Sequence, residues 1–183
     1  MVAKKSSKVL VLRTCAADMT AYGGFVWPRR GVVKAPDWSP EPVCGKGLHG
    51  LLHGEGDGNL LSWEPNAKWL VIEVDEKRVV DLGSKVKFPS GKVVFCGDRL
   101  GATGYIAEHD PGHAVVCGTA TAGNRGTATA GECGTATAGD GGILNLRWWD
   151  GDRYRIATFY VGEGGIEPNV KYGVDGRGKA VRR

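Results

Sequence analysis

The sequence lacks the features that mark a membrane-spanning, secreted or disulfide-stabilised protein. No apolar run approaches the roughly 20 residues that cross a bilayer, and nothing like a secretory leader is recognisable at its start. Its five cysteines are odd in number and widely spaced, which favours reduced thiols. We therefore expect a cytoplasmic protein that has no membrane partner and no disulfide framework.

Long helical patterns are also scarce, whereas glycine is abundant. The 183 residues include 30 glycines, more than double the usual share of about 7%, which indicates many turns and short strands. Six tryptophans and a hydrophobic content of 42% argue against disorder. The length suits one domain with an appended module.

Three octads, GTATAGNR, GTATAGEC and GTATAGDG, follow one another over residues 118–141. In an extended chain the side chains alternate between two faces, so the threonines share one face and the alanines the other. Gly123, Gly131 and Gly139 are expected to take the positive φ of tight corners. Each octad therefore predicts a strand followed by a turn.

Two arrangements of the octads are compatible with this pattern. Repeats of short period usually stack into a solenoid, because one unit cannot bury its apolar face alone. Two octads per coil would place threonine ladders outside and alanines in a thin interior. A small antiparallel meander, with the same strands and glycine turns, is the alternative.

The octad, GTATAG followed by two variable residues, resembles the octapeptide repeats of bacterial ice nucleation proteins. This resemblance covers 24 of the 183 residues. It implies a β-solenoid whose Thr-x-Thr rows organise water.

Outside the octads, the pattern predicts an α+β fold that is mainly β. Apolar runs over residues 8–14, 67–74 and 92–96 predict strands of a mixed sheet. Asp98 is a good N-cap for one short helix that ends near His109, before Pro-Gly.

The segments on both sides of the octads continue their eight-residue spacing. We expect residues 113–117 to form a strand that leads into the array, and residues 142–149 to close it. An Asp150-Gly151 turn predicts a β-hairpin after the array. The predicted domains are a β-rich domain over residues 1–109, an octad module with its hairpin over 110–162, and a Gly-rich basic tail over 163–183.

A second resemblance rests on Cys44, Gly47, Leu48 and His49, which follow a KVLVLRT strand and a Gly-Gly and Trp segment. Over roughly the first hundred residues, the chain is similar to an uncharacterised domain of bacterial, prophage and phage proteins. The resemblance implies a bacterial, prophage or phage context for this chain, but it implies no activity.

Residues that could ligate a metal occur as Cys44-x4-His49-x3-His53 and His109-x3-His113-x3-Cys117. Zinc requires four tetrahedral N or S ligands, and neither triplet has the Cys-x-x-Cys spacing of a zinc site. Packing roles are the alternative for Cys44, His49 and His53. No nucleophile or oxyanion device stands beside them, so we expect no cofactor, and whether the protein is an enzyme stays open.

These patterns are compatible with three alternative functions. The first is a non-enzymatic binding protein of bacterial or phage origin, such as a phage-encoded inhibitor of a host system. The second is a water- or ice-organising protein, and the third is a metal- or His-dependent enzyme. A protein partner, a second copy paired through an open β edge, and nucleic acid bound by the basic tails are the expected partners. The predicted binding surface comprises Thr119, Thr121, Thr127, Thr129, Thr135, Thr137, Trp148 and Trp149.

Overall fold

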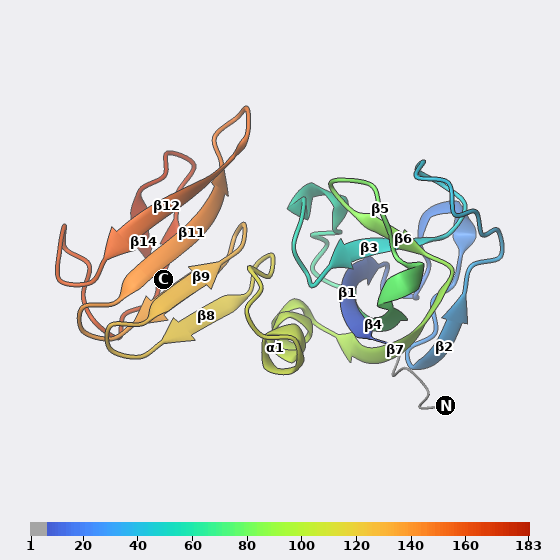
Figure 1. The fold of residues 1–183 in the computed structure, drawn as a ribbon, viewed down its shortest axis with the longest axis horizontal. Coiled ribbons are helices and arrows are strands. Elements are labelled where there is room, and N and C mark those ends of the chain that lie inside the picture. The colour runs from blue at the N-terminus through green and yellow to red at the C-terminus, as the bar shows by residue number, and fades with distance from the viewer. Residues whose placement is uncertain (1–6) are drawn as a thin grey trace, which may run out of the picture. The chain divides into compact units, whose positions relative to one another are not determined.

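The computed structural model describes residues 7–183, which divide into two compact units. Unit 1 ends at Asp110, and unit 2 comprises residues 111–183 (Figure 1). Lys4 and Lys5 of the predicted basic N-terminal tail lie outside the described residues. Within residues 7–183, no helix is both long enough and apolar enough to cross a membrane.

Unit 1 is built on one seven-stranded sheet in the order β2-β7-β4-β1-β3-β6-β5. Every pair of neighbours in it is antiparallel, so the expected mixed sheet is not found. Parallel neighbours need long crossover connections, and within residues 7–183 the one α-helix comes only after the last strand of this sheet. The strands are β1 (Lys8–Cys15), β2 (Gly31–Lys34), β3 (Leu48–Leu52), β4 (Lys68–Asp75), β5 (Val80–Asp81), β6 (Val86–Phe88) and β7 (Ser90–Gly97).

The apolar strands β1 and β4 form the centre of this sheet and pair along their full length, from Lys8 with Asp75 to Cys15 with Lys68. Val11, Leu12 and Val71 are fully buried, so both faces of the pair are covered. A strand that is buried on both faces needs apolar residues at consecutive positions, which explains the runs KVLVLRT and KWLVIEV.

The predicted helix is present as α1 (Arg99–His109), and Asp98 caps it by accepting a hydrogen bond of 2.8 Å from the backbone N–H of Gly101. Ala102 and Ile106 are its fully buried apolar residues. The described part of the unit also contains three short 3-10 helices: η1 (Tyr22–Gly24), η2 (Gly58–Leu60) and η3 (Glu76–Arg78).

Unit 2 contains two open sheets, one in the order β14-β13-β10-β8 and the other in the order β12-β11-β9 (Figure 1). Residues 113–117 form no strand, contrary to our expectation. The segment expected as a tail instead contributes β13 and β14 to the first sheet. The strands are β8 (Thr119–Ala122), β9 (Thr127–Ala130), β10 (Thr135–Ala138), β11 (Ile143–Trp149), β12 (Tyr154–Tyr160), β13 (Tyr172–Val174) and β14 (Ala180–Arg182).

Alternate octads pair with each other, and consecutive octads do not. β8 and β10 are parallel, with Thr135 opposite Thr119, and β9 and β11 are parallel, with Ile143 opposite Thr127. Partners are therefore two octads apart in the sequence. A meander would pair consecutive octads in antiparallel fashion, and the described residues contain no such pair.

The corners of the array differ from the prediction. The residues with positive φ are Arg125 (56°), Cys133 (56°) and Gly141 (64°), and Cys117 (54°) precedes them in the same phase. Gly123, Gly131 and Gly139 do not take positive φ, so that prediction was wrong. These glycines instead allow octads of the array to approach each other closely. A Cβ on Gly139, for example, would lie 2.8 Å from the backbone nitrogen of Asn124 in an earlier octad.

Candidate functional site

The threonines of the octads point outward, as the alternation predicted. On the sheet that contains β8 and β10, Thr119 lies beside Thr135 and Thr121 beside Thr137. The Oγ1 atoms of Thr119 and Thr135 are 3.2 Å apart and share a hydrogen bond. The four side chains thus form two rungs of hydroxyl and methyl groups on one side of the sheet.

The alanines point inward and form the thin core of unit 2. Ala128, Ala130, Ala136 and Ala138 are each at most 2% exposed. Leu144 and later residues fill the remaining volume beside these small side chains. A close-packed interior holds the strands at fixed separation, and so fixes the spacing of the threonines on the outside.

The second sheet has a more mixed outer face. Thr127 and Thr129 of β9 lie beside Ile143 and Asn145 of β11. The Thr158 hydroxyl of β12 donates a hydrogen bond of 2.9 Å to Oδ1 of Asn145. Threonine rows therefore do not continue across this sheet.

Trp148 and Trp149, also predicted as binding residues, lie at the end of β11 and differ in their surroundings. Trp148 packs so closely on Gly178 that a Cβ there would lie 2.6 Å from the indole ring. Trp149 is 45% exposed and meets Tyr154 edge-on, with ring centroids 5.1 Å apart. Arg147, on the same face of the hairpin, stacks on the Tyr154 ring with its guanidinium 4.0 Å from the centroid.

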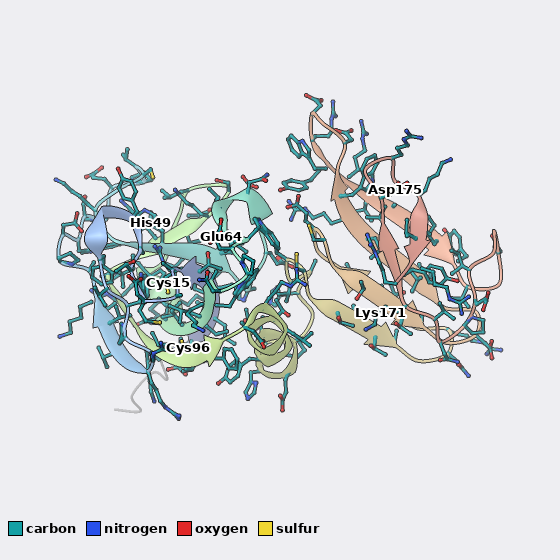
Figure 2. All side chains as sticks on the ribbon, turned by 180° about the vertical axis from the view of Figure 1, so that it is seen from behind. Cys15, His49, Glu64, Cys96, Lys171 and Asp175 are labelled. Atoms are coloured by element: carbon teal, nitrogen blue, oxygen red, sulfur yellow. The ribbon has the colours of Figure 1, made fainter. Side chains whose placement is uncertain are left out.

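Asp150 stabilises the hairpin of β11 and β12, which the sequence pair Asp150-Gly151 predicted. Its carboxylate accepts backbone hydrogen bonds of 2.8 Å from Asp152 and Arg153, and another from the Arg155 guanidinium. These backbone donors, with Arg155, hold the pKa of Asp150 far below its usual value. Asp175 plays the same part between β13 and β14 (Figure 2), and backbone N–H donors lower its pKa as well.

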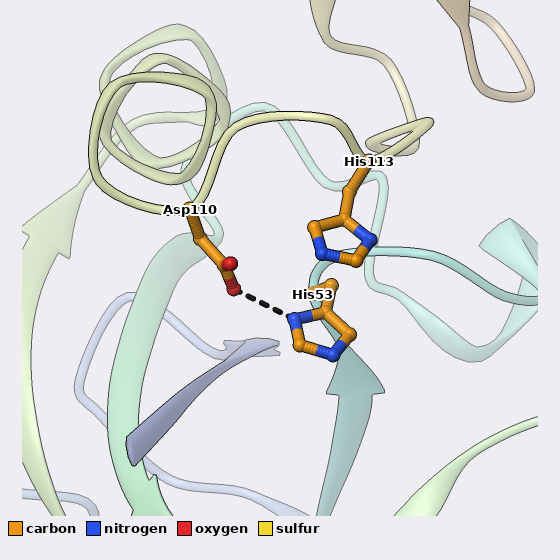
Figure 3. A group of neighbouring side chains, drawn as sticks. All are labelled: His53, Asp110 and His113. Carbon is orange, nitrogen blue, oxygen red and sulfur yellow. Dashed lines mark hydrogen bonds and ion pairs between the residues drawn. The ribbon is translucent and has the colours of Figure 1, made fainter. Parts of the chain in front are cut away.

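The three residues predicted as metal ligands do not come together. Cys44 and His49 line one cavity of unit 1, with a volume of about 370 Å³. His53 lies outside its lining, and its Nδ1 is 2.7 Å from Oδ2 of Asp110 (Figure 3). Of the residues described, no group suited to a metal includes Cys44 or His49. The predicted metal set is therefore not assembled.

The same cavity contains two basic residues that the sequence reasoning missed, Arg13 and Lys85. The available signal was Arg13 itself, a charged residue that directly follows four consecutive apolar residues in the segment KVLVLRT. Burial, and then the nearby Lys85 and Arg13, lower the pKa of His49. The cavity is electropositive, and its lining includes no acidic residue.

A family model, described as a domain of unknown function (DUF7666), matches residues 9–108. Curated relatives are ice nucleation proteins. That of Pseudomonas fluorescens is 44% identical over 111 residues, or 60% of this chain and 9% of the relative. InaU of Pantoea ananas is 35% identical over 135 residues, or 66% of this chain and 13% of the relative.

The protein of Xanthomonas campestris pv. translucens is 41% identical over 106 residues, or 57% of this chain and 7% of the relative. The chain thus spans about a tenth of the length of these relatives, yet the matches extend well beyond the 24 residues of the octads. No solved structure matches. The expected cytoplasmic location is contradicted, because the ice nucleation proteins are surface proteins anchored at the outer membrane.

Proposed function

This chain belongs to the family of the domain of unknown function DUF7666, whose name specifies no activity, and we propose a function from unit 2 instead. Unit 2 is a capped segment of an octad β-solenoid, and its threonine rows hold ordered water against an ice surface. The observation that carries the proposal is the in-register pairing of Thr119 with Thr135 and of Thr121 with Thr137, over a core of alanines.

The solenoid interpretation rests on the pairing across two octads. One octad of each coil lies in the sheet of β8 and β10, and the next lies in the sheet of β9 and β11. The antiparallel strands β12 and β13 pair with β11 and β10 at one end, so they cap the stack there. At the opposite end, β8 and β9 are edge strands of the two sheets, and further octads would add at those edges.

The water-organising role follows from the geometry of the rows. Neighbouring strands lie about 4.8 Å apart, and alternate residues of one strand about 6.7 Å apart. The four threonines therefore repeat hydroxyl and methyl groups on a nearly rectangular grid that the alanine core keeps rigid. Water held by several such groups loses little further entropy on joining a lattice. The names of the curated relatives support this role.

A grid of four threonines is small, so we expect this chain to adsorb to existing ice and not to start freezing by itself. The test is the growth of ice crystals during recrystallisation in the presence of the full chain. Replacement of Thr119, Thr121 and Thr135 by Lys should abolish inhibition, because lysine removes both the methyl groups and the flat surface. Replacement by Val, which preserves shape, should weaken it.

A charge-matched control places three lysines at exposed apolar positions of unit 1, namely Val32, Val43 and Leu100. This control should inhibit recrystallisation as the unchanged protein does. Equal activity of the octad and control variants would refute the role of the threonine rows.

Exposed apolar residues on β12 favour a second function, the binding of a protein partner in a bacterium or phage. Ile156 is 65% exposed and Tyr160 is 51% exposed, and both lie on the outer face of their sheet. Loss of a specific partner on replacement of Ile156 and Tyr160 by Asp would support this second function, and unchanged inhibition of ice recrystallisation by the same variant would show that it is separate from the first.

A further inference from the structure

We propose that the cavity between β1 and β3 in unit 1 binds a small molecule through an oxyanion group, held by Arg13 and Lys85. The bound group is a carboxylate, sulfate or phosphate attached to an apolar body. This site lies in unit 1 and is independent of the threonine rows of unit 2.

The cavity occurs where two neighbouring strands part. β1 and β3 pair only at Val11 with Leu52 and at Leu12 with Leu51. Beyond these two pairs, the guanidinium of Arg13 donates a hydrogen bond of 2.8 Å to the backbone oxygen of His49. The parted strands line a cavity of about 370 Å³, a volume within the range of small-ligand sites.

Arg13 is a largely buried cation without a counter-ion among residues 7–183. Its guanidinium stacks on the buried Trp27 ring, 4.7 Å from the centroid, and the bond to the His49 oxygen is the only hydrogen bond of the Arg13 side chain to a residue of the described chain. None of the carboxylates between residues 7 and 183 forms an ion pair with it. Its Nε is buried and has no acceptor.

Burial lowers the pKa of Arg13 to about 10, so the side chain is still charged at neutral pH. A buried charge without a partner is costly, and a guanidinium offers five N–H donors in a fork that matches an oxyanion. Binding of an anion would therefore supply the partner that this side chain lacks within the described chain.

Other groups around the cavity add to its positive potential. Lys85 lines it, and Lys87 lies nearby, although its Nζ already donates to the backbone oxygen of Val43 at 2.8 Å. His49 (Figure 2) accepts a 3.4 Å hydrogen bond from the backbone N–H of Gly45 at Nε2. That bond needs an unprotonated Nε2, which agrees with a lowered pKa.

The apolar side of the cavity indicates the chemistry of the part of the ligand that is not the oxyanion group. Leu51, Leu60 and Leu61 line the cavity beside the basic groups. An inorganic anion would leave this apolar surface uncovered, whereas an organic acid or a phosphate ester would cover it. We therefore expect an organic anion to bind more tightly than an inorganic one of the same charge.

The test uses the full chain in solution and sodium sulfate as the probe, with sodium chloride at equal ionic strength as the reference. Sulfate keeps its charge across the pH range in which His49 titrates. Amide NMR shifts should change around Arg13, Gly45 and His49 and reach saturation. Isobutyrate and acetate, compared at equal concentration, then test whether the apolar wall contributes.

Three variants locate the binding. Lys85→Ala should weaken sulfate binding roughly three- to fivefold, as expected for a partly exposed charge contact. Lys92→Ala, at an exposed lysine of β7 outside the cavity, should leave it unchanged. Arg13→Lys keeps the charge but loses the fork and should weaken binding more than Lys85→Ala.

The proposal is overturned if sulfate and chloride give the same amide shifts. It is also overturned if Lys85→Ala and Lys92→Ala weaken binding equally, since binding would then reflect net charge alone. Neither result would bear on ice recrystallisation, so the two proposals stand or fall separately.

Discussion

A glycine-to-alanine substitution at a corner of the array tests how tightly the octads stack. A Cβ on Gly134 would lie 2.8 Å from the Gly131 oxygen and 2.9 Å from both the Gly118 oxygen and the Ala130 Cβ. Two of these neighbours are backbone atoms that no rotamer change can move. We expect Gly134→Ala to destabilise unit 2 by about 1–3 kcal/mol, the usual range for overpacking.

The matched control is Gly123→Ala, in the same array. Gly123 has no atom within 4 Å of an added Cβ, and its φ is not positive. This substitution should be neutral or stabilise by up to about 1 kcal/mol, because it restricts the unfolded chain.

The assay is thermal unfolding of the full chain, with hydrogen exchange over residues 118–149 to assign the transition. For a unit of this size, Gly134→Ala should lower Tm by roughly 5–20 °C. Equal effects at Gly134 and Gly123, or none at either, would refute the inference that stacked corners exclude side chains.

Further predictions concern single side chains. Leu144→Ala empties a fully buried position and should lower the free energy of unfolding by about 2–5 kcal/mol in urea titrations. Asp150→Ala removes the acceptor of the hairpin turn and should speed exchange at the backbone N–H groups of residues 152 and 153. Because the folded pKa of Asp150 is lowered, its contribution is present above pH about 4 and is lost as pH falls further. The pKa of His49 is lowered too, so stability should fall as pH drops below about 6.5 while the unfolded chain takes up the proton. His49→Gln should reduce that slope. Iodoacetamide should modify the exposed Cys44 well before the buried Cys15, whose pKa burial raises; equal rates by mass spectrometry would contradict this.

Much of the fold could be predicted from local pattern. The Asp98 cap, the Asp-Gly hairpin and the alternation of threonine and alanine are each decided by neighbours within a few residues, and the structure has all three. The resemblance to octapeptide repeats is confirmed by curated relatives, and the resemblance of the first hundred residues to an uncharacterised domain agrees with the DUF7666 match.

The remaining features depend on contacts that local pattern does not contain. The positive φ falls at Arg125 and Cys133, while the nearby glycines are needed where one octad closely approaches the octad two before it. Spacing suggested that Cys44, His49 and His53 act together, yet β3 ends at Leu52 and His53 turns away with positive φ. The cavity that Arg13 and Lys85 line brings together residues more than seventy positions apart. A single sequence does not indicate which residues so far apart lie close together in the fold.

The most direct test of the threonine rows is the adsorption of the full chain to a growing ice surface. The protein is labelled at its amino groups, and the fraction incorporated into slowly grown polycrystalline ice is compared with that remaining in the liquid. We expect enrichment in ice for the unchanged protein and for the charge-matched control in unit 1, and exclusion of the variant with Lys at Thr119, Thr121 and Thr135. Exclusion of all three proteins, or equal incorporation of all three, would contradict it.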